Sequence, residues 1–339
     1  MTAAAPGPVL VMGAGAVGCY VGGWLRAAGV DVSLVGRPRV LDALRRDGLT
    51  LTDLDGRRTS LAPDALGLAP AVPEHARPAL VLLCVKSAAT AGAAAELARA
   101  LPAGTLVLSL QNGVGNAAAA AAAAPSLRVL AGMVPFNVAF VAPGHVHRGT
   151  EGRLAVQDDA ALRAWAPAFE RAGLPLALHA DMAPVLWVKL LLNLNNPVNA
   201  LSGLPLRAQL LDRGYRRVLA ALQAKALDVL AAAGIVPARL TPLPPRWLPA
   251  LLRLPTPLFR RLAARMLRVD EHATSSMADD LRLGRPTEID ALAGEVVRLA
   301  RQLGRDAPLN ARIADLVRRW PEDPRPMSSS AMLAALGLR

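Results

Sequence analysis

The stretch VLVMGAGAVG, residues 9–18, decides the fold of this chain. It joins four apolar residues to an alanine-rich segment through the glycine pattern G-x-G-x-x-G. Between a strand and a helix, the first glycine permits a tight turn, the second lets the backbone approach a pyrophosphate, and the third allows close helix–strand packing. The sequence therefore predicts a dinucleotide site at a helix N-terminus, held by Gly13, Gly15, Ala16, Val17 and Gly18. An ordinary glycine turn is the alternative interpretation.

Short apolar runs alternate with alanine-rich stretches through the first half of the chain, as is typical of a parallel β-sheet covered by helices. Further on, the residues from Gly144 to Gln157 predict antiparallel strands, followed by a helix near Ala160–Ala172 and a strand at Leu174–His179. We therefore expect a Rossmann-type dinucleotide-binding domain over residues 1–180. Its parallel strands are expected at Val9–Met12, Val30–Val35, Leu80–Val85, Thr105–Leu110 and Arg128–Val134.

From Met182 onward, longer helical periodicities replace the strand signals. They cover Pro184–Leu194, Arg213–Ala233, Ser275–Arg282 and Glu288–Leu303. We therefore expect residues 181–339 to form an all-helical substrate-binding and catalytic domain, which makes the fold class α/β with a helical second domain. The segment Pro237–Pro257 is rich in proline and arginine, which predicts a kinked connection or an insertion whose role the sequence leaves open.

Composition limits the class of protein. With 339 residues, of which 53% are hydrophobic, the chain is long enough for two domains. Its formal charge of +12 comes mostly from scattered arginines, and only 3% of its residues are aromatic. Few stacking platforms and no helix-turn-helix or zinc pattern argue against a nucleic-acid partner. An anionic cofactor and substrate account for part of the positive charge.

The sequence further predicts a cytoplasmic protein without a membrane partner. Cys19 and Cys84 lie far apart in apolar stretches, as is usual for reduced, packed thiols. The first residues lack the basic region of a secretory signal, and the apolar segment Val185–Leu194 is too short to span a bilayer. His145 and His147 alternate in a predicted strand or turn but lack a third ligand nearby in sequence, so we expect no metal site.

The end of the second predicted strand indicates which nicotinamide cofactor the chain prefers. NAD-selective sites place an acidic residue there to accept the ribose 2′-hydroxyl. This chain has Gly36-Arg37 instead, and Asp31 lies at the opposite, entering end of the strand. A guanidinium can pair with a 2′-phosphate, so the sequence favours NADPH over NADH. The alternative for Arg37 is a solvated surface position.

Three further segments supply candidates for the chemistry. Lys86 and Asn112 each follow a predicted parallel strand, at the carboxyl ends where open α/β sheets bind ligands, and we expect them near the nicotinamide. Either residue is also common in a solvated strand end or a turn. Lys189 lies inside an otherwise apolar helix, four residues before Asn193, so the two share a face. A buried ammonium costs free energy unless function requires it, although a lysine can also extend to solvent.

Taken together, these segments resemble the ketopantoate reductase family, the 2-dehydropantoate 2-reductases. The likeness covers nearly the whole chain. Its motifs are GAGAVG at 13–18, CVKS at 84–87, QNGVGN at 111–116, WVKLLLN at 187–193, SSM at 275–277 and TEID at 287–290. The resemblance implies Lys189 as general acid, Glu288 as its partner, and Asn112, Asn193 and Ser276 as substrate contacts. It also implies that Lys86 lies beside cofactor and substrate.

One departure concerns the helix that carries the lysine. In the family, an asparagine eight residues after the lysine precedes a proline, whereas Asn195-Asn196-Pro197 places this step one residue early. We expect Asn196 to be the equivalent substrate contact, with Asn195 or Asn199 as alternatives, and any of them can instead cap or kink the helix. Glu288 is likewise explained, alternatively, as a first-turn acid of a helix that begins near Thr287.

The resemblance implies NADPH-dependent reduction of 2-dehydropantoate to pantoate, a step toward pantothenate and coenzyme A. A protonated amine from the helical domain is expected to reach the keto oxygen while hydride arrives at the carbonyl carbon. The alternatives are reduction of another small 2-keto acid and a non-catalytic NADPH-binding regulator, although the presence of both Lys189 and Glu288 argues against the regulator. We expect a monomer or a homodimer.

Overall fold

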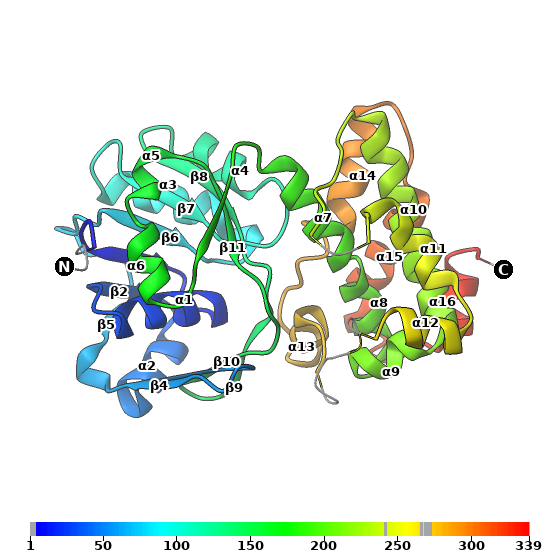
Figure 1. Ribbon diagram of the computed structural model, residues 1–339, viewed down its shortest axis with the longest axis horizontal. Coiled ribbons are helices and arrows are strands. Elements are labelled where there is room, and N and C mark those ends of the chain that lie inside the picture. The colour runs from blue at the N-terminus through cyan, green and yellow to red at the C-terminus, as the bar shows by residue number, and fades with distance from the viewer. Residues whose placement is uncertain (1–4, 241–242, 265–266, 268–272, 339) are drawn as a thin grey trace. The chain divides into compact units, whose positions relative to one another are not determined.

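The computed structural model describes residues 5–240, 243–264, 267 and 273–338. The chain divides into two compact units, Met1–Met182 and Ala183–Arg339. Figure 1 shows β-sheets and helices in the first unit and helices in the second. The sequence analysis placed its domain boundary after residue 180, two residues before the point at which the units divide.

Among the described residues, an eight-stranded sheet forms the centre of the first unit, in the order β12-β11-β8-β7-β6-β1-β2-β5. The strands from β5 to β8 in this order run parallel. Their succession is that of a Rossmann fold, which confirms the predicted α/β class. The bounds are β1 Val9–Met12, β2 Val32–Val35, β5 Gly67–Ala69, β6 Leu80–Leu83, β7 Leu106–Ser109, β8 Arg128–Met133, β11 Leu154–Gln157 and β12 Leu176–His179.

Both faces of this sheet are covered, which explains why the inner strands β1 and β6 are apolar at every position. Side chains alternate between the faces of a strand. Val9 and Val11 therefore pack in one core with residues of α1 (Ala16–Ala27) and α6 (Ala166–Arg171). Leu10 and Met12 pack in the other with residues of α3 (Thr90–Ala100) and α4 (Asn116–Ala123). The carboxyl ends of the strands are left for loops, where ligands of such sheets bind.

A second, four-stranded sheet was not expected from the sequence. Its order is β4-β3-β10-β9. The region predicted as antiparallel strands contains β10 and β11, but the two strands belong to different sheets: β10 pairs with β9 and β3, and β11 pairs with β8 and β12. Apart from the hairpin of β9 and β10, these pairings join segments about 20 or more residues apart, so no local pattern specifies them. The bounds are β3 Leu49–Asp53, β4 Arg58–Leu61, β9 Val138–Ala142 and β10 His145–Arg148.

Two predicted boundaries shift for local reasons. β2 begins at Val32 rather than Val30, because the amide of Val30 donates to the carbonyl of Leu25 and closes the end of α1, after Gly29 at φ +84°. The single helix expected near Ala160–Ala172 is two short helices, α5 (Ala160–Arg163) and α6. Pro167 lacks the N–H that would continue α5 by donating to Arg163.

The second unit contains helices and no strand in the ranges 183–240, 243–264 and 273–338, as predicted. The long α10 packs against α8, α9, α11, α15 and α16, which lie outside the predicted periodicities (Figure 1). The bounds are α7 Ala183–Asn193, α8 Asn195–Ser202, α9 Leu206–Leu211, α10 Arg213–Ala232, η3 Pro245–Trp247, α11 Leu248–Arg253, α12 Thr256–Leu262, α13 Ser276–Arg282, α14 Ala293–Gln302, α15 Pro308–Arg319, η4 Trp320–Glu322 and α16 Ser329–Ala335. In the described part of the chain, no helix is both long and apolar enough to cross a bilayer.

The proline- and arginine-rich segment whose role the sequence left open folds against α10. Apart from residues 241 and 242, which lie outside the described residues, it forms η3, α11 and the start of α12. Arg216 of α10 is fully buried, and its guanidinium donates to the carbonyls of Leu252 and Leu254 at 3.1 and 3.0 Å. The same group lies 4.3 Å from the ring of Phe259. The buried arginine therefore anchors this segment to the helical core.

Candidate functional site

The turn between β1 and α1 has the geometry that its glycine pattern requires. Gly13 has a φ of +113°, and a Cβ built on it would lie 2.7 Å from the backbone nitrogen of Val85. A Cβ on Gly18 would lie 2.1 Å from the carbonyl oxygen of Gly13. A Cβ on Gly15 would meet none of the described atoms within 4 Å. Gly13 and Gly18 are thus imposed by packing inside the protein, whereas Gly15 borders open space that a phosphate can enter.

The start of α1 suits an anion. Gly15 caps the helix with extended backbone and no side-chain hydrogen bond, and the first turn has no acidic residue. The amides of Ala16, Val17 and Gly18 belong to that first turn, where N–H groups have no acceptor within the helix. The positive end of the helix dipole adds to their attraction for negative charge. This end of the first unit therefore has the shape and charge of a pyrophosphate site.

Arg37 follows the carboxyl end of β2 and is exposed. Its neighbour Gly36 lies against the glycine turn, because a Cβ built there would be 2.6 Å from the Cβ of Ala14. Asp31, at the other end of the strand, is 75% exposed and lies 3.9 Å from Arg26, which agrees with its assignment to the entering end. Arg39, in the first turn of α2 (Pro38–Asp47), is a second exposed cation here that the sequence analysis missed. The sequence Arg37-Pro38-Arg39 places the two arginines two residues apart, and this spacing could have indicated the second cation.

The loops that follow β6 and β7 are joined to each other. Lys86 is exposed at the end of the first loop, and the hydroxyl of the next residue, Ser87, donates to the carbonyl of Asn112 at 2.9 Å. Asn116, the first residue of α4, donates to the same carbonyl at 2.6 Å. Both loops lie at the carboxyl edge of the sheet, close to Gly13, whose Cβ position touches Val85. The structure thus gathers the predicted Lys86 and Asn112 loops beside the glycine turn.

Lys189 lies in α7, where most of its helical neighbours are buried. Its side chain is half-buried, and burial lowers the pKa of the ammonium from 10.5 to about 8. Asn193, one turn further along, is buried on the same helix. An ammonium with a pKa near 8 is largely protonated at neutral pH and still gives up its proton readily. Lys189 is therefore a chemically suitable proton donor.

The helix that carries Lys189 is interrupted just before the asparagine–proline step. α7 ends at Asn193 and α8 begins at Asn195, with Leu194 between them at φ −61° and ψ −11°. Among the described residues, the buried side-chain oxygen of Asn195 has no hydrogen-bond donor. Asn196, the predicted substrate contact, is half-buried.

Asn199 has a structural role instead. It is fully buried, and its side-chain oxygen accepts from the amide of Ser275 at 2.8 Å while its nitrogen donates to the carbonyl of Leu204 at 2.8 Å. Ser275 in turn caps α13 by accepting from the amide of Ala278 at 3.2 Å. Ser276 is the exposed first residue of that helix. Asn199 thus ties α8, which carries Asn196, to the helix that carries Ser276.

The expected helix start at Glu288 is wrong. α14 begins at Ala293, and the residues before it form turns in which the amide of Ala291 donates to the carbonyl of Glu288 at 3.1 Å. Leu292, with φ −110° and ψ −93°, has a backbone conformation that interrupts a continuous helix. Glu288 is half-buried in the preceding coil, so it is not a first-turn acid of α14. The alternative, helix-capping explanation of this carboxylate is thereby removed.

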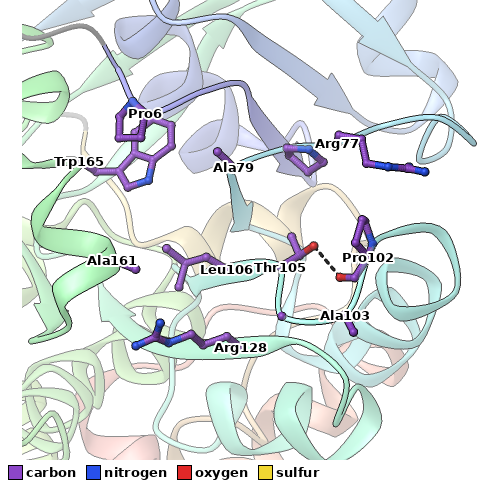
Figure 2. Close-up of a pocket in the computed structure, with 12 residues that line it drawn as sticks. Pro6, Arg77, Ala79, Pro102, Ala103, Thr105, Leu106, Arg128, Ala161 and Trp165 are labelled. Atoms are coloured by element: carbon purple, nitrogen blue, oxygen red, sulfur yellow. Dashed lines mark hydrogen bonds between the residues drawn. The ribbon is translucent and has the colours of Figure 1, made fainter.

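The first unit also has a surface pocket of about 480 Å³, which none of the candidate residues above lines (Figure 2). Its lining includes Thr105 and Arg128, which stand at the amino ends of β7 and β8. The Thr105 hydroxyl donates to the carbonyl of Pro102 at 2.7 Å, and Arg128 pairs with Asp159. Ligands of parallel α/β sheets bind at the opposite, carboxyl edge. The glycine turn therefore remains the candidate site of this unit.

The cysteines and the histidine pair have structural surroundings rather than those of a reactive site. Cys19 and Cys84 are free thiols, and burial raises the pKa of Cys19 to about 12 and that of Cys84 still further from its usual range. Neither is a ready nucleophile, because the thiolate is the reactive form. His145 and His147 each lie 2.9 Å from the hydroxyl of Thr52. Within the described ranges, no group of three or more metal-ligating side chains occurs.

The strand order and the glycine turn define a protein with a Rossmann-type first domain and a helical second domain, a plan found among dehydrogenases and reductases. Family models agree. Residues 9–160 match the model for ketopantoate reductase PanE/ApbA, and residues 181–320 match that for the C-terminal part of the same family. The chain belongs to the ketopantoate reductase family and is an oxidoreductase by that membership.

Individual relatives support the same assignment. A 2-dehydropantoate 2-reductase from Halobacterium salinarum is 33% identical over 317 residues, which cover 91% of this chain and 97% of the relative. The crystal structure of a PanE/ApbA family ketopantoate reductase from Ralstonia eutropha JMP134 is 32% identical, with a TM-score of 0.77 over 92% of this chain and 97% of that chain. D-mandelate dehydrogenase with NADH and anilino(oxo)acetate has the same fold, with a TM-score of 0.75 over 98% of this chain and 100% of that chain, at 18% identity.

Proposed function

We propose that this protein catalyses the NADPH-dependent reduction of 2-dehydropantoate to pantoate. The observation that carries the proposal is Lys189, an ammonium in an apolar helix whose pKa burial lowers to about 8. A reduction of a keto group needs a proton donor for the oxygen that gains negative charge. Lys189 supplies such a donor, and relatives over the length of the chain are named 2-dehydropantoate 2-reductase.

The cofactor fits the first unit. Gly13 and Gly18 leave no room for a Cβ, and open space lies over Gly15, as a bound pyrophosphate requires. We assign the pyrophosphate to Gly13, Gly15, Ala16, Val17 and Gly18. The exposed Arg37 is assigned to the 2′-phosphate, with Arg39 beside it, because among the described residues from 36 to 40 there is no carboxylate to favour NADH.

When bound, NADPH supplies a hydride to the 2-carbonyl carbon. Lys86 and Asn112 hold the nicotinamide end, since their loops meet next to the glycine turn. Lys189 donates the proton to the keto oxygen. Glu288 acts as its partner and favours the protonated ammonium, which burial opposes. This role needs a carboxylate that is not used as a helix cap, and α14 starts five residues after Glu288.

Amide and hydroxyl groups orient the substrate. We assign Asn112, Asn193, Asn196 and Ser276 to its carboxylate and hydroxyl groups. The tie between Asn199 and Ser275, at 2.8 Å, holds the helices of Asn196 and Ser276 together and supports a shared role for these two residues. We place the reaction in the cytoplasm, because both cysteines are free thiols, and we expect the protein to act as a monomer or homodimer.

A panel of substrates tests the proposal. NADPH and NADH oxidation is measured with 2-dehydropantoate, 2-ketoisovalerate, pyruvate and an aromatic 2-keto acid. We expect the highest kcat/KM for 2-dehydropantoate with NADPH. No preference for 2-dehydropantoate rejects the substrate, and an equal rate with both nicotinamides rejects the assignment of Arg37.

A second candidate is reduction of another small 2-keto acid. The shifted asparagine–proline step favours it, because it moves the asparagine that we assign to the substrate one residue along the chain. The proposed roles of proton donor, its carboxylate partner and substrate contact apply to any such carbonyl. They are assigned to Lys189, Glu288 and Ser276. The aromatic member of the panel is included because D-mandelate dehydrogenase shares the fold. A maximum for that compound or for a branched keto acid supports this second candidate.

A further inference from the structure

A series of hydrogen bonds between buried side chains supports the loops that contain Lys86 and Asn112. The hydroxyl of Thr90, the first residue of α3, donates to the side-chain oxygen of Asn116 at 3.0 Å and accepts from the side-chain nitrogen of Gln111 at 2.5 Å. Ser109, at the end of β7, donates to the oxygen of Gln111 at 2.8 Å. Asn116 then donates to the carbonyl of Asn112. Each of the four linking side chains, Ser109, Thr90, Gln111 and Asn116, is less than 10% exposed.

The carbonyl of Asn112 sets the direction of this chain of bonds, because it can only accept. The side-chain nitrogen of Asn116 donates to it, so the amide oxygen of Asn116 faces Thr90 and accepts from the Thr90 hydroxyl. A reversed amide would place two oxygens against each other and lose the bond to Asn112. The carbonyl of Asn112 also accepts from Ser87, which directly follows Lys86. The backbone of Asn112 is therefore held from two sides, and one of them depends on Thr90.

We propose that Thr90 is a positioning residue for the nicotinamide end of the cofactor site, because its hydroxyl, acting through Asn116, fixes Asn112 in place beside the Lys86 loop. This inference rests on the proposed reductase function. Hydride transfer needs the reacting atoms about 3–3.5 Å apart, and a displacement of about 1 Å costs roughly a hundredfold in rate. The phosphate contacts lie on other residues, so the chain of bonds affects turnover rather than nucleotide affinity.

The test compares three threonine variants. Thr90→Val keeps the shape but removes the hydroxyl, and we expect kcat to fall at least about tenfold while the Kd for NADPH, measured by fluorescence titration, changes less than about threefold. Thr90→Ser keeps the hydroxyl and is expected to retain kcat within about threefold. Thr105→Val, at the amino edge of the same sheet, removes a hydroxyl that donates only to a nearby carbonyl and serves as the matched control with wild-type kinetics.

A double variant separates positioning from a purely structural role. If Thr90 acts through Asn112, Thr90→Val lowers kcat much less in an Asn112→Ala background than in the wild type. Should Thr90→Val fail to fold, Ser87→Ala removes the other donor to the same carbonyl and is expected to lower kcat about threefold without weakening NADPH.

The outcomes are distinct. A Thr90→Val protein with a lower melting temperature but wild-type kcat overturns the inference, and so does a Thr90→Ser protein whose kcat falls as far as that of Thr90→Val. The inference also fails if Thr90→Val lowers kcat as much in the Asn112→Ala background as in the wild type. Where Ser87→Ala replaces Thr90→Val, an unchanged kcat overturns it. The wild type is assayed in parallel. If it neither binds NADPH nor reduces any 2-keto acid, the proposed function fails and the inference falls with it. An active wild type with an unaffected Thr90→Val variant rejects the inference alone.

Discussion

The two units of the molecule hold their candidate functional side chains in different ways. In the first unit, the glycine turn, Arg37 and the Lys86 and Asn112 loops each follow a parallel strand, and the sheet itself places these strand ends side by side. In the second unit, the helices that carry Asn196 and Ser276 are joined by Asn199 and Ser275, which are 76 residues apart. A sheet thus gathers short sequence motifs by its topology, whereas a helical unit needs individual long-range contacts to fix the spacing of its groups.

This difference makes the helical unit the more sensitive of the two to single buried polar residues. Arg216 illustrates the point, because one guanidinium contacts the carbonyls of Leu210, Leu211, Leu252 and Leu254. A sheet distributes the same task over many backbone hydrogen bonds. We therefore expect substitutions in the second unit to change stability or turnover, and to leave nucleotide binding, a property of the first unit, unchanged.

The largest effect is expected from Arg216→Met. The substitution leaves buried carbonyls without donors, so the free energy of unfolding of the helical unit should fall by about 3–5 kcal/mol. Urea denaturation followed by circular dichroism measures this change, with exposed Arg213→Met in the same helix as control. NADPH binding at low temperature should persist. A loss of less than about 1 kcal/mol would show that the proline-rich segment does not depend on Arg216.

Next in size is Lys189→Ala. Loss of the general acid should lower kcat at least about a hundredfold, while the Kd for NADPH stays close to that of the wild type. Steady-state kinetics and a fluorescence titration measure the two quantities, and Lys225→Ala in α10 is the matched control. An unchanged kcat would remove Lys189 from the mechanism. Weaker NADPH binding would instead contradict the separation of roles between the units.

A smaller, selective effect is expected in the first unit. Arg37→Ala should weaken NADPH by about 10- to 100-fold, the range of a lost charge-assisted contact, and leave NADH almost unchanged. Titration with both nucleotides measures the difference. Arg45→Ala, at the far end of α2, is the control, because Arg45 pairs with Asp42 at 2.8 Å. Equal weakening of both nucleotides would mark Arg37 as structural, and a remaining preference for NADPH would point to Arg39.

The smallest effect concerns pH. Burial lowers the pKa of Lys189 to about 8, so the protonated form that donates to the substrate predominates below that pH and is lost above it. The rate of reduction should therefore fall about tenfold between pH 7 and pH 9, and oxidation of the alcohol, which needs the neutral amine, should rise. Initial rates in both directions measure this. A profile that is flat up to pH 10 would mean that Lys189 keeps an ordinary pKa in the working enzyme.

The comparison also shows where sequence patterns suffice. The parallel strands β1, β2, β6, β7 and β8 were predicted to within about two residues at each end, because an apolar run with turns on either side specifies a buried strand locally. The β3, β4, β5 and β9 strands were missed. β5 has three residues and pairs with β2, more than 30 residues earlier, whereas β3, in which threonine alternates with leucine, pairs with the adjacent β4 and with the distant β10.

The candidate site shows the same limit. Glycine positions in the turn followed from the pattern alone, because the motif itself specifies them, although the steric reason for Gly13 includes the distant backbone of Cys84 and Val85. Thr90 carried no signal, since a threonine in an alanine-rich helix reveals nothing of the two amides that it joins. Asn199 was left as an alternative to Asn196 for the same reason: only the packing of α8 against α13 shows that its amide is fully used.

By itself, the sequence determined the class of fold, the order of the two domains, the position of the glycine turn and the set of polar residues from which a reductase site can be built. These properties depend on the local alternation of apolar residues and on short motifs. Tertiary structure alone decided that Glu288 precedes rather than begins a helix, and which buried amides hold the loops. The reason is physical: a hydrogen bond between residues distant in sequence exists only after the chain has folded, and burial, which shifts the pKa of Lys189, is a property of the packed protein.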